Sequence, residues 1–497
     1  DLNSFRRISW DQAIDEVCAS VDRVRDRAKS LGYLPAWQIG QTPLPFMGPA
    51  LGVFGNHSSG NLYDAFYASI GWNVRGHPAI DMLNSKLILV WGADPQATSP
   101  HLQFLMTRAK DAGIPIVVID PRFTPTASAM ATGAAGLPAW IAIRPGTDSA
   151  LLVAMANTIF RRGLHDDAFI RQYCFGFYPN DSVVSQSPAK HPVSGKPFAG
   201  TQFTVPPGQS FVEYLDDLQR EQGGEAGVLR WAAALTGVPA ATIEALALSY
   251  AKAGAACIYA GNTTGGAQRT SNGLYFTWLV VALSSMTGNV TRRGGGIGHV
   301  NGNDGYGVTL GKTPALSGIK PAKLILFSRH MSSQVILTGR DARTAEQLRA
   351  DVLLQNGIDL GPDARLSIDM IWRGGGSADE FNQRGAINPK LVAWKKPHSI
   401  VSYEFFMSST ARWSDIVLPA STNMEQSFFS GSRLNADTNI VNQLVAPMYE
   451  SRPDWRINEM VAERLGLDYG RKGKTDEELM RIQWAGATLP DSYRKIN

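Results

Sequence analysis

The stretch Leu87-Ile88-Leu89-Val90-Trp91-Gly92-Ala93-Asp94-Pro95 decides the fold. Its first five residues form an unbroken apolar run, which is typical of a parallel strand buried on both faces. The pattern returns at Ile116-Val117-Val118-Ile119-Asp120-Pro121-Arg122, after a helical stretch over residues 100–112. Strand, helix and strand in this order predict a βαβ unit with a right-handed crossover.

A third strand is expected at residues 140–143, followed by Arg144-Pro145-Gly146-Thr147-Asp148 and a helix over residues 149–162. Each of the three strands is thus followed by a polar loop that carries an aspartate: Asp94, Asp120 or Asp148. In open α/β sheets, ligands bind beyond the carboxyl ends of the strands. We therefore expect these three loops to line one crevice.

A second set of strands is expected further along the chain, at residues 257–260, 368–372, 399–403 and 416–418. Together the two sets predict an α/β fold of two doubly wound, Rossmann-like domains with mostly parallel sheets and a cofactor crevice between them. An amphipathic helix is expected over residues 9–29, a second helix over 62–69 and a short strand at 37–39.

Two glycine-rich turns, 261–266 and 374–377, are suited to phosphate because backbone N–H groups approach a ligand closely there. Neither matches GxGxxG or a P-loop, so a simple turn is the alternative for both. An aspartate that closes a strand can accept from ribose hydroxyls or a guanine edge, but Asp148 could equally cap the next helix.

Composition narrows the class of protein. The chain has 497 residues, 44% of them hydrophobic, which predicts two to four globular domains. The net charge of +4 and the absence of a basic run give no support for nucleic-acid binding. The longest apolar stretch, residues 274–286, is too short to span a membrane. Three isolated cysteines and eight scattered histidines form no metal motif.

Several segments, taken in order, resemble one family. They are Arg7 to Ala13, Asn84 to Pro95, Ile119 to Thr124, Ile143 to Asp148, Met286 to Val290, and Met407 to Pro419 with Glu425. In order and spacing the chain resembles the molybdopterin oxidoreductases of the dimethyl sulfoxide reductase type. The resemblance implies a molybdenum bis(molybdopterin guanine dinucleotide) cofactor, held by two related α/β domains.

The resemblance also implies which residues bind each dinucleotide. One arm would be held by Asp94, Pro95, Asp120, Arg122, Gly146 and Asp148. Along the other arm would lie Gly261, Gln268, Arg269, Gly375, Glu404, Ser409 and Asp415. Glu404 stands where many members of the family have aspartate, so its carboxylate lies one methylene further from the backbone.

The metal ligand implied by the resemblance is Ser58, within Gly55-Asn56-His57-Ser58-Ser59-Gly60. High-valent molybdenum is a hard ion that favours oxygen donors, which suits a serine alkoxide. From the residues alone, Ser58 or Ser59 would simply cap the following helix. His57 replaces a tyrosine of the family beside the ligand, and Ile39 replaces another, so we expect an altered substrate pocket.

The leading functional hypothesis is an anaerobic respiratory oxidoreductase that takes an oxygen atom from a small S-oxide or N-oxide. The alternatives with the same cofactor are a hydroxylase, a transhydroxylase or a hydratase. A metal-free structural subunit, as in respiratory complex I, is an alternative of another class. A two-domain nicotinamide dehydrogenase has less support, because no GxGxxG follows a strand.

We expect the chain to be an interior part of a larger subunit. The expected domains are a first domain in two pieces, 1–79 and 268–470, an inserted dinucleotide-binding domain at 80–267, and a tail at 471–497 that leads to a cap domain. A [4Fe-4S] cluster belongs, if anywhere, outside these residues. The resemblance implies an iron–sulfur electron-transfer subunit, a membrane-anchor subunit and an extracytoplasmic location, with no membrane span in the chain itself.

Overall fold

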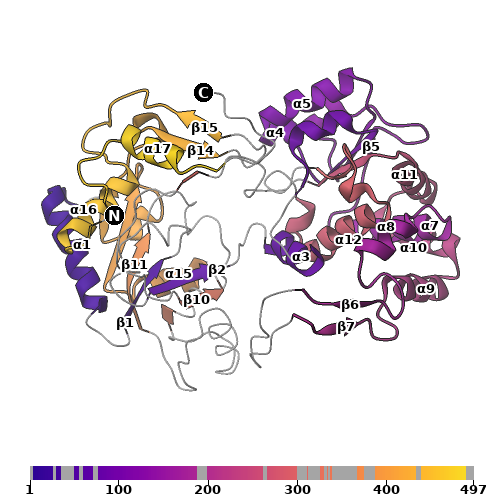
Figure 1. Ribbon diagram of the computed structural model, residues 1–497, viewed down its shortest axis with the longest axis horizontal. Helices are drawn as coiled ribbons and strands as arrows, with labels where there is room; N and C mark the ends of the chain where they lie inside the picture. Colours follow the sequence, from indigo (N-terminus) through magenta and orange to yellow (C-terminus); the bar gives the residue numbers. More distant parts are fainter. Residues whose placement is uncertain are drawn as a thin grey trace.

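The computed structural model shows two lobes, each built around a parallel sheet (Figure 1). It describes residues 4–25, 30–34, 50–54, 60–70, 76–186, 199–260, 266–298, 310–311, 325–328, 333, 336–337, 367–373, 387–431, 438–468 and 470–488. The predicted α/β fold with mostly parallel sheets is confirmed.

We call the lobe built around the five-stranded sheet the second lobe and the one built around the six-stranded sheet the first lobe. The second lobe contains the strands that the sequence indicated most clearly. Its strand order is β5-β4-β3-β8-β9, and every pairing is parallel. The strands are β3 (Leu87–Trp91), β4 (Ile116–Ile119), β5 (Trp140–Ile141), β8 (Ala256–Tyr259) and β9 (Gly296–Ile297). All residues of β3, β4 and β8 are buried, as expected for strands covered on both faces.

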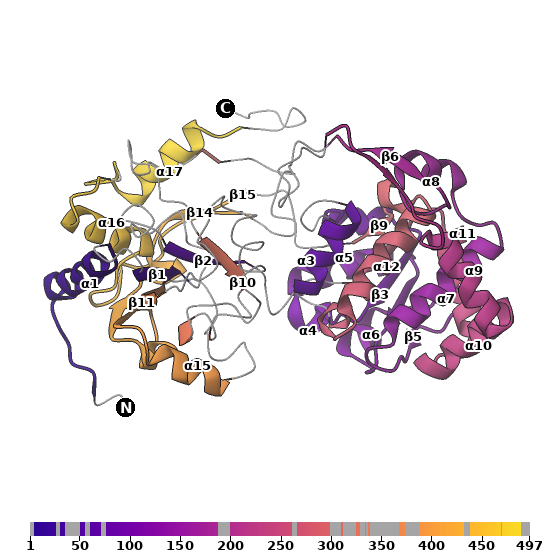
Figure 2. The ribbon, with the colours of Figure 1, turned by 90° about the horizontal axis from the view of Figure 1, so that it is seen from below.

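Helices cover both faces of this sheet (Figure 2). Leu89 and Trp91 share a core with the helices of one face, whereas Ile88 and Val90 join a second core on the other face. Helices of the first core are α3 (Gly60–Ile70), α7 (Asp148–Arg161), α8 (Asp167–Tyr173), α9 (Phe211–Gln222), α10 (Glu225–Thr236), α11 (Ala240–Lys252) and α12 (Gly273–Met286). Those of the second core are η2 (Ala79–Asn84), α5 (Pro100–Asp111) and α6 (Pro125–Met130).

The first lobe has the strand order β10-β2-β1-β11-β12-β13, again with parallel pairings. Its strands are β1 (Ser30–Leu34), β2 (Ala50–Phe54), β10 (Ile325–Ser328), β11 (Ser367–Arg373), β12 (Ser399–Glu404) and β13 (Ile416–Pro419). Helices α1 (Trp10–Arg25) and α16 (Asp454–Arg464) lie side by side in both views and bury one face of this sheet. The two ends of the chain therefore meet in one lobe.

The remaining described elements are short helices, two antiparallel hairpins and two further helices. They are α4 (Pro95–Thr98), η3 (Ala267–Arg269), η4 (Asn289–Thr291), η6 (Ala411–Trp413) and η7 (Asn423–Glu425), the hairpins β6 (Ser182–Val184) with β7 (Gln202–Thr204) and β14 (Phe428–Gly431) with β15 (Thr438–Val441), and the helices α15 (Ile387–Trp394) and α17 (Asp476–Ala485).

The second lobe is longer than the sequence indicated. Its sheet extends to β9, past the expected boundary at residue 267, and Leu62 and Phe66 of α3 already belong to its core. Strands β1, β2 and β10 were not anticipated, because Gly32 and Gly52 interrupt the first two apolar patterns. The strand expected at 37–39 lies outside the described residues.

Among the residues that the structure describes, no single helix has both the length and the apolar character needed to cross a membrane. Helices α10 and α11 pass that test only as a pair bent by 109°. Many residues of both helices are buried in the core of the second lobe.

Candidate functional site

Three aspartates follow the neighbouring strands β3, β4 and β5, as the sequence predicted. Burial raises the pKa of Asp120; the Arg122 backbone N–H and guanidinium oppose this shift, whereas the charges of Asp94 and Asp148 add to it. The Asp120 carboxylate is therefore close enough to Asp94 and to Asp148 to be affected by the charges of both. This arrangement makes a concentrated set of hydrogen-bond acceptors at one edge of the sheet.

Asp94 is held by the helix that follows the next strand. Its Oδ1 accepts from the Thr126 backbone N at 3.1 Å and from Thr126 Oγ1 at 2.6 Å. Asp94 occupies the N-cap position of α4, with Pro95 as the first helical residue, but its side chain makes no cap bond there. The carboxylate thus joins α6 to the end of β3.

Asp120 is fixed by its own loop. Its Oδ1 accepts from the Arg122 backbone N at 2.9 Å, and its carbonyl oxygen accepts from Trp140 Nε1 at 2.9 Å. The Arg122 side chain is exposed. This loop therefore offers a buried carboxylate and an exposed guanidinium two residues apart.

Asp148 is the most buried of the three, and its partner was not predicted. Its Oδ1 accepts from Trp91 Nε1 at 2.8 Å. Burial raises the pKa of Asp148, against the hydrogen bonds from the Trp91 indole and from the backbone of Asp148 and Gly146. Helix α7 begins at Asp148 and its N-cap is Thr147, so the alternative that Asp148 caps this helix is wrong.

Glycines shape the loops around these carboxylates. Gly146 has φ of +80°, a conformation that favours glycine, and no atom lies within 4 Å of where a Cβ would stand. The backbone can therefore approach a ligand there. Gly266 N donates to Gly92 O, which joins the glycine-rich turn before η3 to the end of β3.

Gln268 and Arg269 lie on η3, directly after that turn. Gln268 is buried and Arg269 is exposed. Asn272, just beyond them, donates from Nδ2 to Gly146 O at 3.5 Å. Gln268 and Arg269 thus lie in a segment that contacts the ends of the second-lobe strands through Gly266 and Asn272, and their expected role along the second arm stays a prediction.

In the first lobe, Glu404 ends β12 and is paired with Arg373, which ends the neighbouring β11. Arg373 Nη1 donates to Glu404 Oε1 at 2.8 Å, and Ser408 Oγ donates to the same oxygen at 3.2 Å. The Arg373 side chain is 3% exposed, so this is a largely buried ion pair. Ser409, the predicted site residue, is exposed next to Ser408.

Asp415 lies at the opposite end of the same sheet. It precedes β13, and its Oδ2 accepts from the backbone N of Ile400, near the start of β12. Burial raises its pKa against that bond and the charge of His398. Asp415 therefore does not share the carboxyl edge with Glu404, and its observed contact is to the backbone of the sheet.

Four predicted site residues lie outside the described residues: His57, Ser58, Gly261 and Gly375. Within the part of the chain that is described, no three His, Cys, Asp or Glu side chains are grouped to hold a metal ion. The predicted ligand role of Ser58 stays a prediction.

Comparison with known proteins assigns the chain to a family. The family model described as molybdopterin oxidoreductase matches residues 1–464. The chain belongs to the molybdopterin oxidoreductase family.

Named relatives of this molybdopterin oxidoreductase include two sulfoxide reductases. It is 28% identical to dimethyl sulfoxide reductase DmsA of Escherichia coli K12, over 97% of the chain and 57% of that protein. It is also 28% identical to the dimethyl sulfoxide/trimethylamine N-oxide reductase of Cereibacter sphaeroides, over 93% of the chain and 54% of that protein. The chain thus spans about half the length of the curated relatives it matches.

A solved structure shares the fold. Acetylene hydratase from Pelobacter acetylenicus superposes with a TM-score of 0.58 at 17% identity, over 98% of this chain and 65% of that one. At this identity the likeness shows the architecture alone.

The family implies a molybdenum–pterin cofactor, and the residues of the second lobe fit its dinucleotide form. The ribose hydroxyls and the N–H groups of guanine are hydrogen-bond donors. The carboxylates of Asp94, Asp120 and Asp148 can accept hydrogen bonds from them. An exposed guanidinium such as that of Arg122 suits a diphosphate. The open backbone at Gly146 leaves room for close approach.

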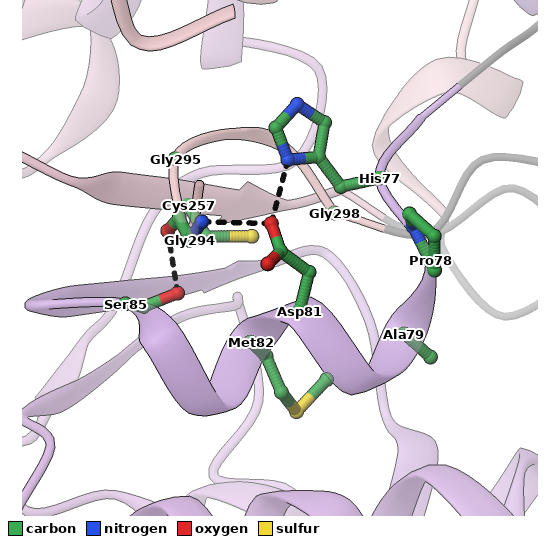
Figure 3. A pocket seen from close by; sticks show the side chains of 10 residues that line it. All are labelled: His77, Pro78, Ala79, Asp81, Met82, Ser85, Cys257, Gly294, Gly295 and Gly298. Atoms are coloured by element: carbon green, nitrogen blue, oxygen red, sulfur yellow. Dashed lines mark hydrogen bonds and ion pairs between the residues drawn. The ribbon is translucent and has the colours of Figure 1, made fainter. Parts of the chain in front are cut away.

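A small cavity elsewhere in the second lobe lies beside η2 and is bordered by a hydrogen-bonded cluster (Figure 3). It holds about 10 Å³ and is lined in part by His77, Asp81, Ser85, Cys257 and Gly294. Asp81 accepts from His77 Nδ1 at 2.9 Å and from Gly294 N at 2.7 Å. Although burial opposes it, these bonds lower the pKa of Asp81.

The thiol beside this cavity is not reactive. Burial raises the pKa of Cys257 to about 12, so the sulfur stays protonated and is a poor nucleophile or metal ligand. Ser85 Oγ donates to Gly294 O at 2.6 Å, which completes the closure around the cavity. The cluster fastens η2 to the edge of the sheet rather than forming a second active site.

Proposed function

We propose that the full-length protein is a molybdenum-dependent oxidoreductase that reduces a small S-oxide or N-oxide. Its cofactor would be bis(molybdopterin guanine dinucleotide), and when bound this group supplies the two-electron oxygen-atom transfer chemistry. The names of the sulfoxide and N-oxide reductases that match along nearly the whole chain support this substrate class.

The single observation that carries the proposal is the convergence of Asp94, Asp120 and Asp148 on the carboxyl edge of one sheet. Burial, with a smaller contribution from the charges of Asp94 and Asp148, disfavours the ionised form of Asp120, and a ligand rich in hydrogen-bond donors would relieve this. The role of these residues is to accept from the guanosine of one dinucleotide. The Arg122 guanidinium would neutralise part of its diphosphate.

Ser58 is part of the same proposal as the protein ligand of molybdenum, with His57 beside it at the substrate side. An iron–sulfur subunit as electron donor, a membrane-anchor subunit and an extracytoplasmic location also belong to the proposal. Their support is the resemblance to sulfoxide reductases.

The test uses the full-length protein, produced in a host that makes the cofactor. Molybdenum is measured by mass spectrometry, GMP is measured after acid hydrolysis, and oxidation of reduced viologen is followed with dimethyl sulfoxide and trimethylamine N-oxide. We expect bound molybdenum, released GMP and substrate-dependent viologen oxidation. Ser58→Ala should retain GMP but lose activity.

Absence of both molybdenum and GMP from correctly folded protein would overturn the proposal in favour of a structural subunit. Molybdenum and GMP without viologen oxidation would instead point to non-redox chemistry on the same cofactor. Asp120→Ala is the companion variant, because it should lower GMP content without touching the metal ligand.

A further inference from the structure

Trp91 is held rigidly at the end of β3. The side chain is fully buried, and its ring lies 5.8 Å from that of Phe276 on α12 at a tilt of 59°. The packed core fixes the indole, and the Nε1–H group meets Asp148 Oδ1 at 2.8 Å. The orientation of the Asp148 carboxylate is therefore set by a group that cannot move independently of the core.

A structural role alone would not require a carboxylate as the partner. A buried indole N–H needs an acceptor, and a backbone carbonyl is sufficient. Trp140, on the neighbouring β5, donates to the carbonyl oxygen of Asp120, and Trp10 donates to that of Glu450. At Trp91 the acceptor is instead the carboxylate of Asp148, which is buried, so its charge is costly. Trp455 also donates to a carboxylate, Asp476 Oδ1 at 3.0 Å, but Asp476 is only partly buried.

The character of the donor matters as well. An indole is neutral, so it orients Asp148 without cancelling the negative charge of the carboxylate. The indole N–H donates to Oδ1 of Asp148 and not to Oδ2. A carboxylate that is oriented yet still charged is what a donor-rich ligand requires.

We propose that Trp91 is the positioning residue of the dinucleotide site, which holds the Asp148 carboxylate in the orientation that the hydrogen-bond donors of a bound guanosine require. This inference rests on the proposed function. Trp91 does not touch the ligand; it acts through Asp148. Loss of the indole N–H should weaken guanine-nucleotide binding most at low pH, where Asp148 is hardest to ionise.

The test measures binding of GDP, as a probe, to the cofactor-free full-length protein by calorimetry from pH 5 to 8. The variants are Trp91→Phe, Asp148→Asn and their combination. Trp455→Phe is the matched control, because its indole also donates to a carboxylate but belongs to the first lobe. We expect Trp91→Phe to weaken GDP binding about tenfold at low pH, the loss of one hydrogen bond to a charged group. The loss should shrink as pH rises.

Two further comparisons separate positioning from packing. Trp455→Phe should change GDP affinity less than about twofold, and Trp91→Phe should add nothing in the Asp148→Asn background. A Trp91→Phe effect that is independent of pH, or additive with Asp148→Asn, would overturn the inference. Failure of the wild-type protein to bind GDP, with no GMP released from protein made with cofactor, would instead overturn the proposed function and this inference with it.

A second measurement covers the case in which Trp91→Phe does not fold. The indole N–H resonances of the wild-type protein are followed after labelling with ¹⁵N-tryptophan. On addition of GDP the Trp91 signal should shift, while that of Trp455, whose indole partner lies outside the dinucleotide site, should not. An unchanged Trp91 signal under saturating GDP would overturn the proposal.

Discussion

Asp148 in the second lobe and Glu404 in the first lobe are matching carboxylates with different donors. Each lies at the carboxyl edge of its sheet, and each is held by a buried side chain at the end of another strand. The donor for Asp148 is the neutral indole of Trp91, whereas the donor for Glu404 is the cation Arg373. Trp91 therefore orients the charge of Asp148 without neutralising it, whereas Arg373 neutralises the charge of Glu404.

The neutral donor in one lobe and the cationic donor in the other have different consequences for stability. In the second lobe, Asp120 and Asp148 are buried acids with raised pKa values, so their ionised forms reduce stability, and under the proposed function they serve a ligand. In the first lobe, the ion pair joins β11 to β12 and stabilises the sheet. We expect the carboxylates of the second lobe to dominate ligand recognition and the pair of the first lobe to dominate folding.

The largest expected effect is that of Arg373→Met. Removing one partner of a buried ion pair leaves the other charge unpaired, which costs about 3–5 kcal/mol of stability. We expect about 3 kcal/mol, because the Glu404 side chain keeps 19% exposure and can recover some water. Thermal unfolding and hydrogen exchange of the β11 and β12 amides would measure the loss.

Arg373→Met with Glu404→Gln is the control for that prediction. A neutral amide needs no cation, so the double variant should regain part of the lost stability. If the double variant were less stable than Arg373→Met alone, the pair would not be the stabilising contact.

Two hydroxyls sharpen the comparison. Thr126 Oγ1 donates to Asp94 Oδ1 and accepts from Gln96 N, while Ser408 Oγ donates to Glu404 Oε1 and accepts from Ala411 N.

Thr126 is fully buried and Ser408 only partly so. Thr126→Val should therefore lower the free energy of unfolding by about 2 kcal/mol and Ser408→Ala by about 1 kcal/mol. Water can replace the lost hydroxyl at the partly exposed site but not at the buried one. Equal losses in chemical denaturation would show that burial does not set the difference.

The smallest expected effect comes from Asp120→Asn. Because the folded state raises the pKa of Asp120, the native protein binds more protons than the unfolded chain just above pH 3.8. The contribution of this group to stability therefore falls as pH rises through its native pKa. Asp120→Asn should be more stable than wild type at pH 7, by less than about 1 kcal/mol, and this difference should vanish once the pH falls below 3.8.

Asp81→Asn is the matched control of opposite sign. The pKa of Asp81 is lowered in the folded state, so its contribution is present above pH 3.8 and is lost as pH falls further. This variant should be less stable than wild type at pH 7. A pH-independent gap in melting temperature for Asp120→Asn would contradict the assignment.

The strands of the second lobe could be predicted because burial on both faces requires continuous apolar runs, as in β3 and β4. Strands β1 and β2 contain glycine, and β9 has only two residues, so no pattern marked them. Pairing to distant strands, not local propensity, makes them strands.

The site was predictable only where a residue follows a strand. Asp94, Asp120 and Asp148 obey this rule, whereas Asp415 precedes its strand and lies at the other edge. Trp91 and Arg373 were missed because each is the last residue of an apolar strand, where a buried donor looks like part of the core. Only the tertiary contact shows which carboxylate they hold.

The insertion of one lobe into the other also sets an order of events during synthesis. Strand β1 pairs with β11, about 330 residues later in the chain. At ~5–20 residues per second, the ribosome needs roughly 15 to 65 s to supply that partner. The last strand of the second lobe, β9, ends at Ile297, so this lobe can fold while β1 still lacks β11 and β2 still lacks β10. Parallel strands that await a distant partner are exposed to misassembly, so we expect the folding of the first lobe to limit the yield of the whole protein.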